Sequence, residues 1–327
     1  MPQIPAVAEL LESAVVVSLP MRVRFRGLTR REVLLVHGPA GWGEFGPFVE
    51  YDDEESAWWL ASAIEAAYVG PPAARRGSVE INATVPAVPA EQVAQILRRF
   101  PGARTAKVKV AEPGQTLADD VDRVAAVREL IDVVRVDANM NWSVPEAITA
   151  IKALGELEYV EQPCRTIEEL AQVRRAVGTP IAADESIRKA DDPMRVIAAD
   201  AADVAILKVA PLGGMRRILD LAERIKLPVV ISSALDSAVG IAAGVATAAA
   251  LPVAPPACGL GTGGFFEHDV ADPFAPVDGR LEPRTVELHA DLPLADPERT
   301  HWWLDRLTRC HALLAAGHPA GGATAGR

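Results

Sequence analysis

The chain contains VVRVDAN (133–139), EYVEQP (158–163), PIAADES (180–186) and DVAILKV (203–209), four short runs that follow one pattern. In each run an apolar, β-branched segment meets a charged residue near its end. Together with a serine in the next such run, these residues recur every 23 or 24 positions: Asp137, Glu161, Asp184, Lys208 and Ser232. An interval of this length holds one strand, one helix and two loops. The repeat therefore predicts strand–helix–strand units around a parallel sheet.

Further strands and helices extend this repeat in both directions. The other expected strands are VEINATV (79–85), TAKVKV (105–110), PVVISSA (228–234) and ACGLG (257–261). Helical patterns lie between the strands, at 117–131, 144–157, 167–177, 213–225 and, as a buried helix, 238–251. Eight strands predict closure into a TIM-like (β/α)7β barrel of the α/β class. The alternative is an open doubly wound sheet, but such a sheet usually carries a Gly-rich phosphate loop after its first strand. No such loop follows INATVPAV (81–88).

The two ends of the chain have other patterns. Residues 15–27 and 31–47 resemble antiparallel strands with a Gly-Pro turn, and an amphipathic helix is expected at 56–68, which predicts a small α+β unit within residues 1–80. The barrel is expected to occupy residues 81–264. The segment 265–327 is loop-rich, with one expected strand, PRTVEL (283–288), and one helix at 301–317. Its last ten or so residues are small and polar, which predicts disorder.

Composition limits the kind of protein. A chain of 327 residues fits a barrel of about 250 residues plus a smaller domain. The net charge of −11 argues against a nucleic-acid partner, which needs a basic face. Three scattered cysteines indicate neither a disulfide framework nor a zinc site, and they favour a reducing cytoplasm. The N-terminus lacks the features of a signal peptide, and no apolar stretch reaches the roughly 18 residues of a membrane span.

Three carboxylates are expected at the ends of successive barrel strands: Asp137, Glu161 and Asp184. A barrel gathers the carboxyl ends of its strands at one face, so these side chains should converge there. Close carboxylates repel one another unless a cation neutralises them. Ligation by oxygen alone suits Mg²⁺, or Mn²⁺ in its place. The alternative is that each acid caps the following helix or pairs with an arginine.

Lysines occur on two of the same strands. Lys107 and Lys109 are two residues apart and therefore share one face, while Lys208 is expected almost opposite Lys109. Two lysines that face each other over a metal suit proton transfer beside a metal-held carboxylate. The alternative is that the lysines only pair with the acids, without catalysis. A Schiff-base aldolase would need one lysine and would leave the three acids unexplained.

The motifs KVK (107–109), DAN (137–139), EQP (161–163), DES (184–186) and LK (207–208) occur in this order. In order and spacing they resemble the muconate-lactonizing-enzyme subgroup of the enolase superfamily, over nearly the whole chain. WGEFGP (42–47) is similar to that family's capping domain, to which the C-terminal segment would return. The resemblance implies that the three acids bind Mg²⁺, that Lys109 is the acid and base, and that Lys208 faces it. It implies close supporting roles for Lys107 and Asn139. Glu185 is expected to point away from the barrel axis.

Three further features resemble those members of the subgroup that dehydrate a cyclohexadiene carboxylate bearing hydroxyl and succinyl groups. Arg135 lies two residues before Asp137, ISSALDSAVG (231–240) follows the seventh strand, and GLGTGGFF (259–266) follows the eighth. Hydroxyl and N–H groups that would contact a substrate carboxylate come from Ser232, Ser233, Gly261, Thr262 and Gly263. For each of these the alternative is ordinary turn chemistry.

Two rival functions stay open at this point. An N-acylamino acid racemase or dipeptide epimerase of the same superfamily uses the same acids but needs proton transfer by both lysines. A non-catalytic, metal-stabilised binding barrel would tolerate the loss of either lysine. In either enzymatic interpretation the partner is a small-molecule carboxylate. The sequence leaves the oligomeric state undetermined.

Overall fold

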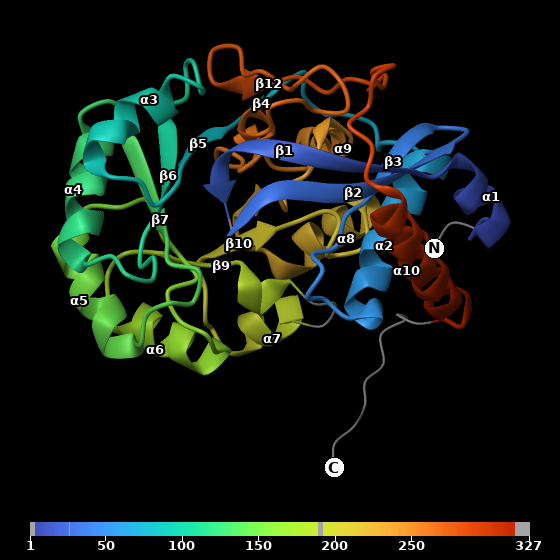
Figure 1. Ribbon diagram of the computed structural model, residues 1–327. Helices are drawn as coiled ribbons and strands as arrows, with labels where there is room; N and C mark the ends of the chain where they lie inside the picture. The colour runs from blue at the N-terminus through green and yellow to red at the C-terminus, as the bar shows by residue number, and fades with distance from the viewer. Residues whose placement is uncertain (1–3, 26, 189–191, 318–327) are drawn as a thin grey trace.

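The computed structural model describes residues 4–25, 27–188 and 192–317. A curled sheet of seven parallel strands, surrounded by helices, occupies one side of the molecule (Figure 1). The strands follow one another in chain order: β5 (Asn82–Val85), β6 (Thr105–Lys109), β7 (Val133–Asp137), β8 (Val160–Glu161), β9 (Ile181–Ala183), β10 (Val204–Leu207) and β11 (Val229–Ile231). Most of their residues are buried, as expected for a sheet covered on both faces.

The expected eighth strand is present only as isolated bridges that close the barrel. Cys258 pairs with Ile81 at one edge of the sheet, and Gly259 pairs with Ser232 at the other. Backbone hydrogen bonds from Asn82 N to Cys258 O and from Gly259 N to Ile231 O complete the closure, each 2.8–2.9 Å long. The (β/α)7β prediction is therefore confirmed, with a very short last strand.

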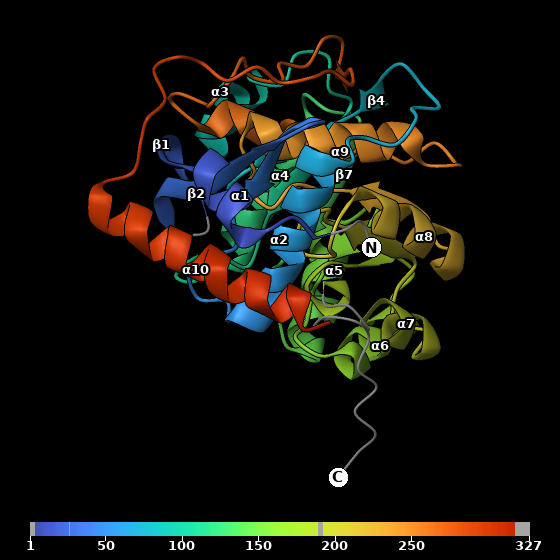
Figure 2. The same ribbon diagram turned by 90° about the vertical axis from the view of Figure 1, so that its right-hand side faces the viewer.

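Helices follow the strands and form the outer layer (Figures 1 and 2). They are α3 (Val93–Leu97), preceded by the 3₁₀ turn η1 (Ala90–Gln92), α4 (Leu117–Arg128), α5 (Val144–Leu154), α6 (Ile167–Ala176), α7 (Asp192–Ala198), α8 (Met215–Ile225) and α9 (Ala238–Ala250). Three of them begin at capping boxes, in which a Ser or Thr and an acid three residues later satisfy each other's backbone N–H: Thr116–Asp119, Ser143–Glu146 and Thr166–Glu169.

A smaller α+β unit packs beside the barrel. Its antiparallel sheet consists of β1 (Val15–Phe25), β2 (Leu28–Gly38) and β3 (Gly41–Phe45). Its helices are α1 (Val7–Ser13), α2 (Asp53–Tyr68) and α10 (Pro297–Ala315) from the far end of the chain. In Figures 1 and 2 the red α10 lies beside the blue α2, and the two helices are in contact. Because Ser18 N donates to Pro293 O and Ala295 N to Val16 O, the returning segment also runs along β1.

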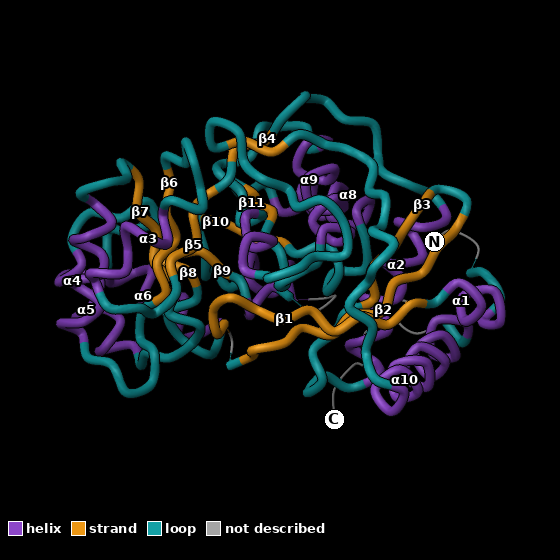
Figure 3. Tube along the Cα trace, turned by 45° about the horizontal axis from the view of Figure 1, so that its top comes forward, coloured by secondary structure: helices purple, strands orange, loops and turns teal. Residues whose placement is uncertain are grey.

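Three expectations about elements were wrong in detail. VEINATV is divided, because β4 (Val79–Glu80) pairs with β12 (Arg280–Leu281) in a separate two-stranded sheet and only β5 joins the barrel. PRTVEL (283–288) forms no strand and belongs to the connection that leads to α10, where loops are drawn in teal in Figure 3. The expected helices 117–131 and 144–157 end earlier, at Arg128 and Leu154. The predicted disorder of the last residues concerns positions 318–327, outside the described part of the chain.

Candidate active site

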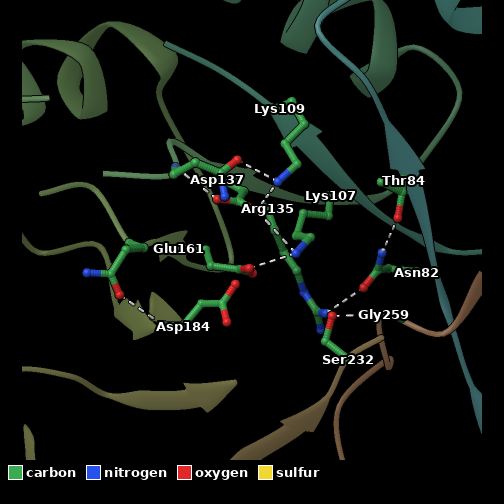
Figure 4. A network of polar contacts seen from close by, with 12 residues as sticks. Asn82, Thr84, Lys107, Lys109, Arg135, Asp137, Glu161, Asp184, Ser232 and Gly259 are labelled. Atoms are coloured by element: carbon green, nitrogen blue, oxygen red, sulfur yellow. Dashed lines mark hydrogen bonds and ion pairs between the residues drawn. The ribbon is translucent and has the colours of Figure 1, made fainter. Parts of the chain in front are cut away.

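The register of the parallel strands places the charged residues at one level. Lys109 pairs with Asp137 across β6 and β7, and Asp137 pairs with Glu161 across β7 and β8. Asp184 follows directly after β9. All three carboxylates are buried, since the strand ends that carry them are covered by the surrounding structure. They therefore converge at the carboxyl ends of three successive strands (Figure 4).

The lysines lie between these carboxylates. Lys107 Nζ donates to Glu161 Oε1 at 2.7 Å and lies 3.3 Å from Asp137 Oδ2. Lys109 Nζ donates to Asp137 Oδ2 and to Asn139 Oδ1, both at 2.6 Å. Lys208, which directly follows β10, pairs with Asp184. The structure thus brings together all six ionisable residues that the sequence assigned to the metal and to proton transfer or its support.

These contacts determine how the groups titrate. Burial raises the pKa of Asp137, but Lys109 and Lys107 lower it by more, so the net pKa lies below its ordinary value. Burial also raises the pKa of Asp184, but Arg188 and Lys208 lower it by more, so its net pKa lies below the ordinary value as well. Burial lowers the pKa of Lys107, yet Glu161 and Asp137 hold it well above its usual value. Two aspartates are therefore firmly ionised.

Glu161 lacks comparable compensation. Burial first, and Asp137 next, raise the pKa of Glu161 to about 8 despite Lys107. Its Oε2 is buried without a hydrogen-bond partner. Among the described residues, no three His, Cys, Asp or Glu side chains are arranged as a ready metal-binding group. The three acids nevertheless fit a hard divalent cation, because all their donors are oxygens and a cation would satisfy the orphaned Glu161 oxygen.

A cavity of about 50 Å³ opens above this layer. Ser232, Ser233 and Thr262 line it, and the Ser233 and Thr262 hydroxyls are 2.6 Å apart. Gly261 and Gly263 do not line it, although they flank Thr262 in η3 (Gly261–Phe265). A Cβ at Gly261 would lie 2.8 Å from Phe100, so close packing rather than substrate contact accounts for that glycine.

Aromatic side chains of the α+β unit cover one side of the cavity. Phe48, Tyr51 and Trp59 all line it, and their ring centroids are 5.6–6.1 Å apart. Phe48 and Tyr51 lie in the connection from β3 to α2. The α+β unit therefore caps the carboxyl end of the barrel.

Comparison with known proteins gives the relationship of the chain. Residues 90–287 match the family described as enolase C-terminal domain-like, and residues 16–67 match enolase N-terminal domain-like. The o-succinylbenzoate synthase of Mycobacterium tuberculosis (strain ATCC 25618 / H37Rv) is 63% identical over 319 residues, covering 96% of this chain and 98% of that protein. The o-succinylbenzoate synthase of Mycolicibacterium smegmatis is 63% identical over 317 residues, covering 95% and 99%.

The chain belongs to the o-succinylbenzoate synthase family of the enolase superfamily. Enzymes of this family are hydro-lyases, and the superfamily requires a divalent metal ion. Solved structures agree in fold. Muconate lactonizing enzyme from Pseudomonas putida has a TM-score of 0.70 at 22% identity, covering 90% of this chain and 98% of that chain. The L-Ala-D/L-Glu epimerase from Bacillus subtilis has a TM-score of 0.71 at 20% identity, covering 86% and 98%.

Arg135, the arginine two residues before Asp137 that resembles the family pattern, lies below the cavity and does not line it. Its guanidinium donates to Glu158, to Ala257 O at 2.6 Å and to Asn82 Oδ1 at 3.3 Å, and it stacks on Tyr159. These hydrogen bonds join the first and third strands to the closing segment, as Figure 4 shows in part. Among the described residues, its hydrogen bonds go to Glu158, Asn82 and Ala257 and to none of the three carboxylates, so it supports the layer on which they lie.

The expectation for Glu185 was wrong. Its carboxylate lines the cavity and accepts a hydrogen bond from Asn139 Nδ2 at 3.1 Å. Alternation along a strand predicted the opposite direction, but β9 ends at Ala183 and Glu185 begins the 3₁₀ turn η2 (Glu185–Ile187). Strand alternation does not apply in a helical turn.

Sequence reasoning missed Arg188 and the aromatic residues of the cap. Arg188 is 3.1 Å from Asp184 Oδ1, 3.3 Å from Glu185 Oε1 and 3.1 Å from the Tyr51 hydroxyl. One signal was available: an arginine four residues after Asp184, within one turn of a short helix. No comparable signal identified Tyr51, because its place over the barrel depends on how the two units pack.

Proposed function

We propose that this chain catalyses the syn-dehydration of 2-succinyl-6-hydroxy-2,4-cyclohexadiene-1-carboxylate to o-succinylbenzoate in menaquinone biosynthesis. One observation carries the proposal: Lys109 and Lys208 reach a single cavity from different strands, beside three convergent carboxylates. The near-complete match to o-succinylbenzoate synthases supports the choice of substrate.

Charge balance supports a substrate with two carboxylates. In the described part of the chain, eight ionisable side chains of the site line or adjoin the cavity: Lys107, Lys109, Lys208 and Arg188, against Asp137, Glu161, Asp184 and Glu185. Fully ionised, these groups cancel. A bound divalent ion would make the site net positive, by two charges while Lys109 is protonated and by one when Lys109 is the neutral base, and either state favours an anionic substrate. A buried charge without compensation is costly, so the site favours dicarboxylates over neutral molecules.

The proposed roles of the residues follow from their positions. Asp137, Glu161 and Asp184 hold the metal ion, which we propose is Mg²⁺, with Mn²⁺ able to replace it. When bound, the ion supplies positive charge beside the substrate carboxylate as negative charge grows there. Lys109 removes the proton from the carbon that bears the carboxylate. Lys208 stays cationic and stabilises the developing negative charge from the other side.

Lys109 then completes the reaction on the same face. The proton that it took is given to the leaving hydroxyl, so the C–H and C–O bonds break on one side of the ring and water departs. Asp137 and Asn139 hold the Lys109 ammonium through 2.6 Å contacts, which fixes its position between the two transfers. Lys107 neutralises Glu161 and Asp137 from below, and Ser232, Ser233 and Thr262 are placed to bind the distal carboxylate.

A racemase or epimerase acting on N-acylamino acids or dipeptides is the second candidate. The observation that favours it is the same pair of lysines, since two bases on opposite sides of a carbon can exchange its proton. We further propose that the partner is a small molecule rather than a nucleic acid, and that the compartment is the cytoplasm. The buried, free thiols of Cys164, Cys258 and Cys310 support this compartment. No helix among the described residues is long and apolar enough to cross a membrane.

A direct assay tests the proposal. Purified protein should convert the cyclohexadiene to the aromatic product, followed by ultraviolet absorbance. Excess EDTA should abolish turnover, and Mg²⁺ should restore it. Mg²⁺ should also raise the unfolding temperature, because it binds the native state, and Asp184→Asn should reduce that increase. Full turnover in excess EDTA would refute the metal role. Racemisation without dehydration would favour the second candidate.

A further inference from the structure

A continuous series of polar contacts runs from the cap to the catalytic lysine. Arg188 donates from one Nη atom to the Tyr51 hydroxyl at 3.1 Å, and its other Nη atom lies 3.3 Å from Glu185 Oε1. Asn139 Nδ2 donates to the same Glu185 oxygen at 3.1 Å. Lys109 Nζ donates to Asn139 Oδ1 at 2.6 Å. Three intermediate side chains thus connect Tyr51 of the cap to Lys109 of the barrel.

The chemistry of each member determines the direction of every contact. An ammonium group can only donate, and an ionised carboxylate can only accept. The Asn139 amide between them must therefore direct its oxygen to Lys109 and its nitrogen to Glu185. Arg188 only donates, so it fits between the Glu185 carboxylate and the oxygen of Tyr51. Loss of one member therefore removes one of the contacts that orient its neighbour.

Both ends of the series are held by other contacts. At the barrel end, Asn139 adopts a positive φ of 44°, and its backbone N–H donates to Asp137 Oδ1 at 3.0 Å. At the cap end, Arg306 of α10 donates to the backbone carbonyls of Phe48 and Tyr51. A displacement of the cap segment from Phe48 to Tyr51 is therefore transmitted to the middle members.

The middle members of the series are largely buried, which strengthens their hydrogen bonds. The side chains of Arg188 and Glu185 are only 10% and 12% exposed. Hydrogen bonds between charged groups are stronger in such surroundings than at the surface, and an unpaired group there is costly. Arg188 also lies 3.1 Å from Asp184, which ties the series to the third carboxylate of the site.

We infer that Tyr51, Arg188, Glu185 and Asn139 form a cap-to-base relay that positions Lys109 for proton transfer when the cap is seated on the barrel. The four are positioning residues, since they act through Lys109. The inference rests on the proposed function. It assigns the Tyr51 hydroxyl a role in orienting the base, rather than in contacting substrate.

A double-mutant cycle between the two ends tests the relay. Tyr51→Phe removes one hydroxyl and keeps the ring, and Asn139→Gly removes the side chain at a backbone conformation that glycine adopts without strain. Residues that act independently have multiplicative effects on rate, whereas coupled residues do not. Tyr51→Phe should lower kcat by roughly three- to thirty-fold and leave KM nearly unchanged. The double variant should be no slower than Asn139→Gly alone.

The control is Tyr68→Phe, which removes a hydroxyl from the same cap at the end of α2, outside the cavity lining. It should leave kcat and KM unchanged. Effects of Tyr51→Phe and Asn139→Gly that multiply, or a rise in KM for Tyr51→Phe with unchanged kcat, would overturn the relay. If the wild-type protein does not turn over the cyclohexadiene, the proposed function fails. The same cycle is then measured by chemical unfolding, where non-additive effects support the relay and additive effects overturn it.

Discussion

Lys109 and Lys208 have different surroundings, and this difference bears on the reaction type. Lys109 contacts Asp137 and the neutral amide of Asn139. Lys208 pairs with Asp184, and burial, followed by Arg188, lowers its pKa below the ordinary value. In a one-base dehydration only Lys109 must gain and lose a proton. Lys208 needs only its positive charge.

Substitutions separate these two requirements. Lys109→Ala should lower dehydration by at least the roughly 10²–10⁴-fold typical of a lost general acid or base. Lys208→Arg keeps the charge but cannot act as a base at neutral pH, so it should retain more dehydratase activity than Lys208→Ala. Any racemase activity should disappear in both Lys208 variants. Rates on the cyclohexadiene and on an N-acylamino acid provide the measurement. Equal loss in Lys208→Arg and Lys208→Ala would contradict the charge role.

At the level of elements, the sequence was informative where a periodic pattern controls geometry. The interval of 23 or 24 residues located β7 to β11, and the helical patterns located the starts of α4, α5 and α6 at residues 117, 144 and 167. Patterns failed where an element is too short to have a period. The closing strand around Cys258 consists of single bridges, and Glu185 lies in one helical turn. Contacts such as Arg188 with Tyr51 join residues 137 positions apart, which no local pattern reveals.

The contact between β3 of the cap and α9 of the barrel is an element-scale feature that the sequence did not reveal. Glu44 of β3 accepts hydrogen bonds from the backbone N–H groups of Ser237 and Gly240 at the start of α9, at 3.0 and 3.2 Å. Burial and the nearby Asp236 nevertheless raise the pKa of Glu44 to about 8, against the Ser237 hydrogen bond and Arg31. Asp269 also raises it. The cap thus holds a protonated carboxyl against a barrel helix at neutral pH.

This group should make stability depend on pH. Glu44 binds its proton more tightly in the folded protein than in the unfolded chain, where its pKa is near 4.5. The stabilisation of the fold that comes from this bound proton is fully present below about pH 4.5 and is lost as the pH rises toward 8. The wild type should therefore lose stability relative to Glu44→Gln over this interval, by up to about 1.4 kcal/mol per pH unit. Denaturant unfolding at pH 5, 6.5 and 8 measures it. A difference between the two proteins that does not vary with pH would contradict this assignment.

At the level of the whole molecule, the two ends of the chain together support the cavity. The last helix, α10, packs on α2 and carries Arg306, whose side chain is 2% exposed. Arg306 donates to Phe48 O, Tyr51 O and Ser56 Oγ, near the start of the chain. Phe48 and Tyr51 line the cavity. The C-terminal segment therefore helps to position cap residues that line a cavity whose charged residues come from the middle of the chain.

Two arginines on α10 provide a matched test of this arrangement. Arg306→Met removes the three hydrogen bonds to Phe48 O, Tyr51 O and Ser56 Oγ, which should lower the free energy of unfolding by about 1–3 kcal/mol. Arg309, three residues later, is 52% exposed and pairs with Asp53. Arg309→Met should therefore change the free energy of unfolding by no more than roughly 0.5 kcal/mol. Because the cap segment loses its anchor, Arg306→Met should also lower kcat, measured at a temperature where the variant is fully folded. Equal effects of the two substitutions on stability and on kcat would mean that α10 supports the fold without positioning the cap over the cavity.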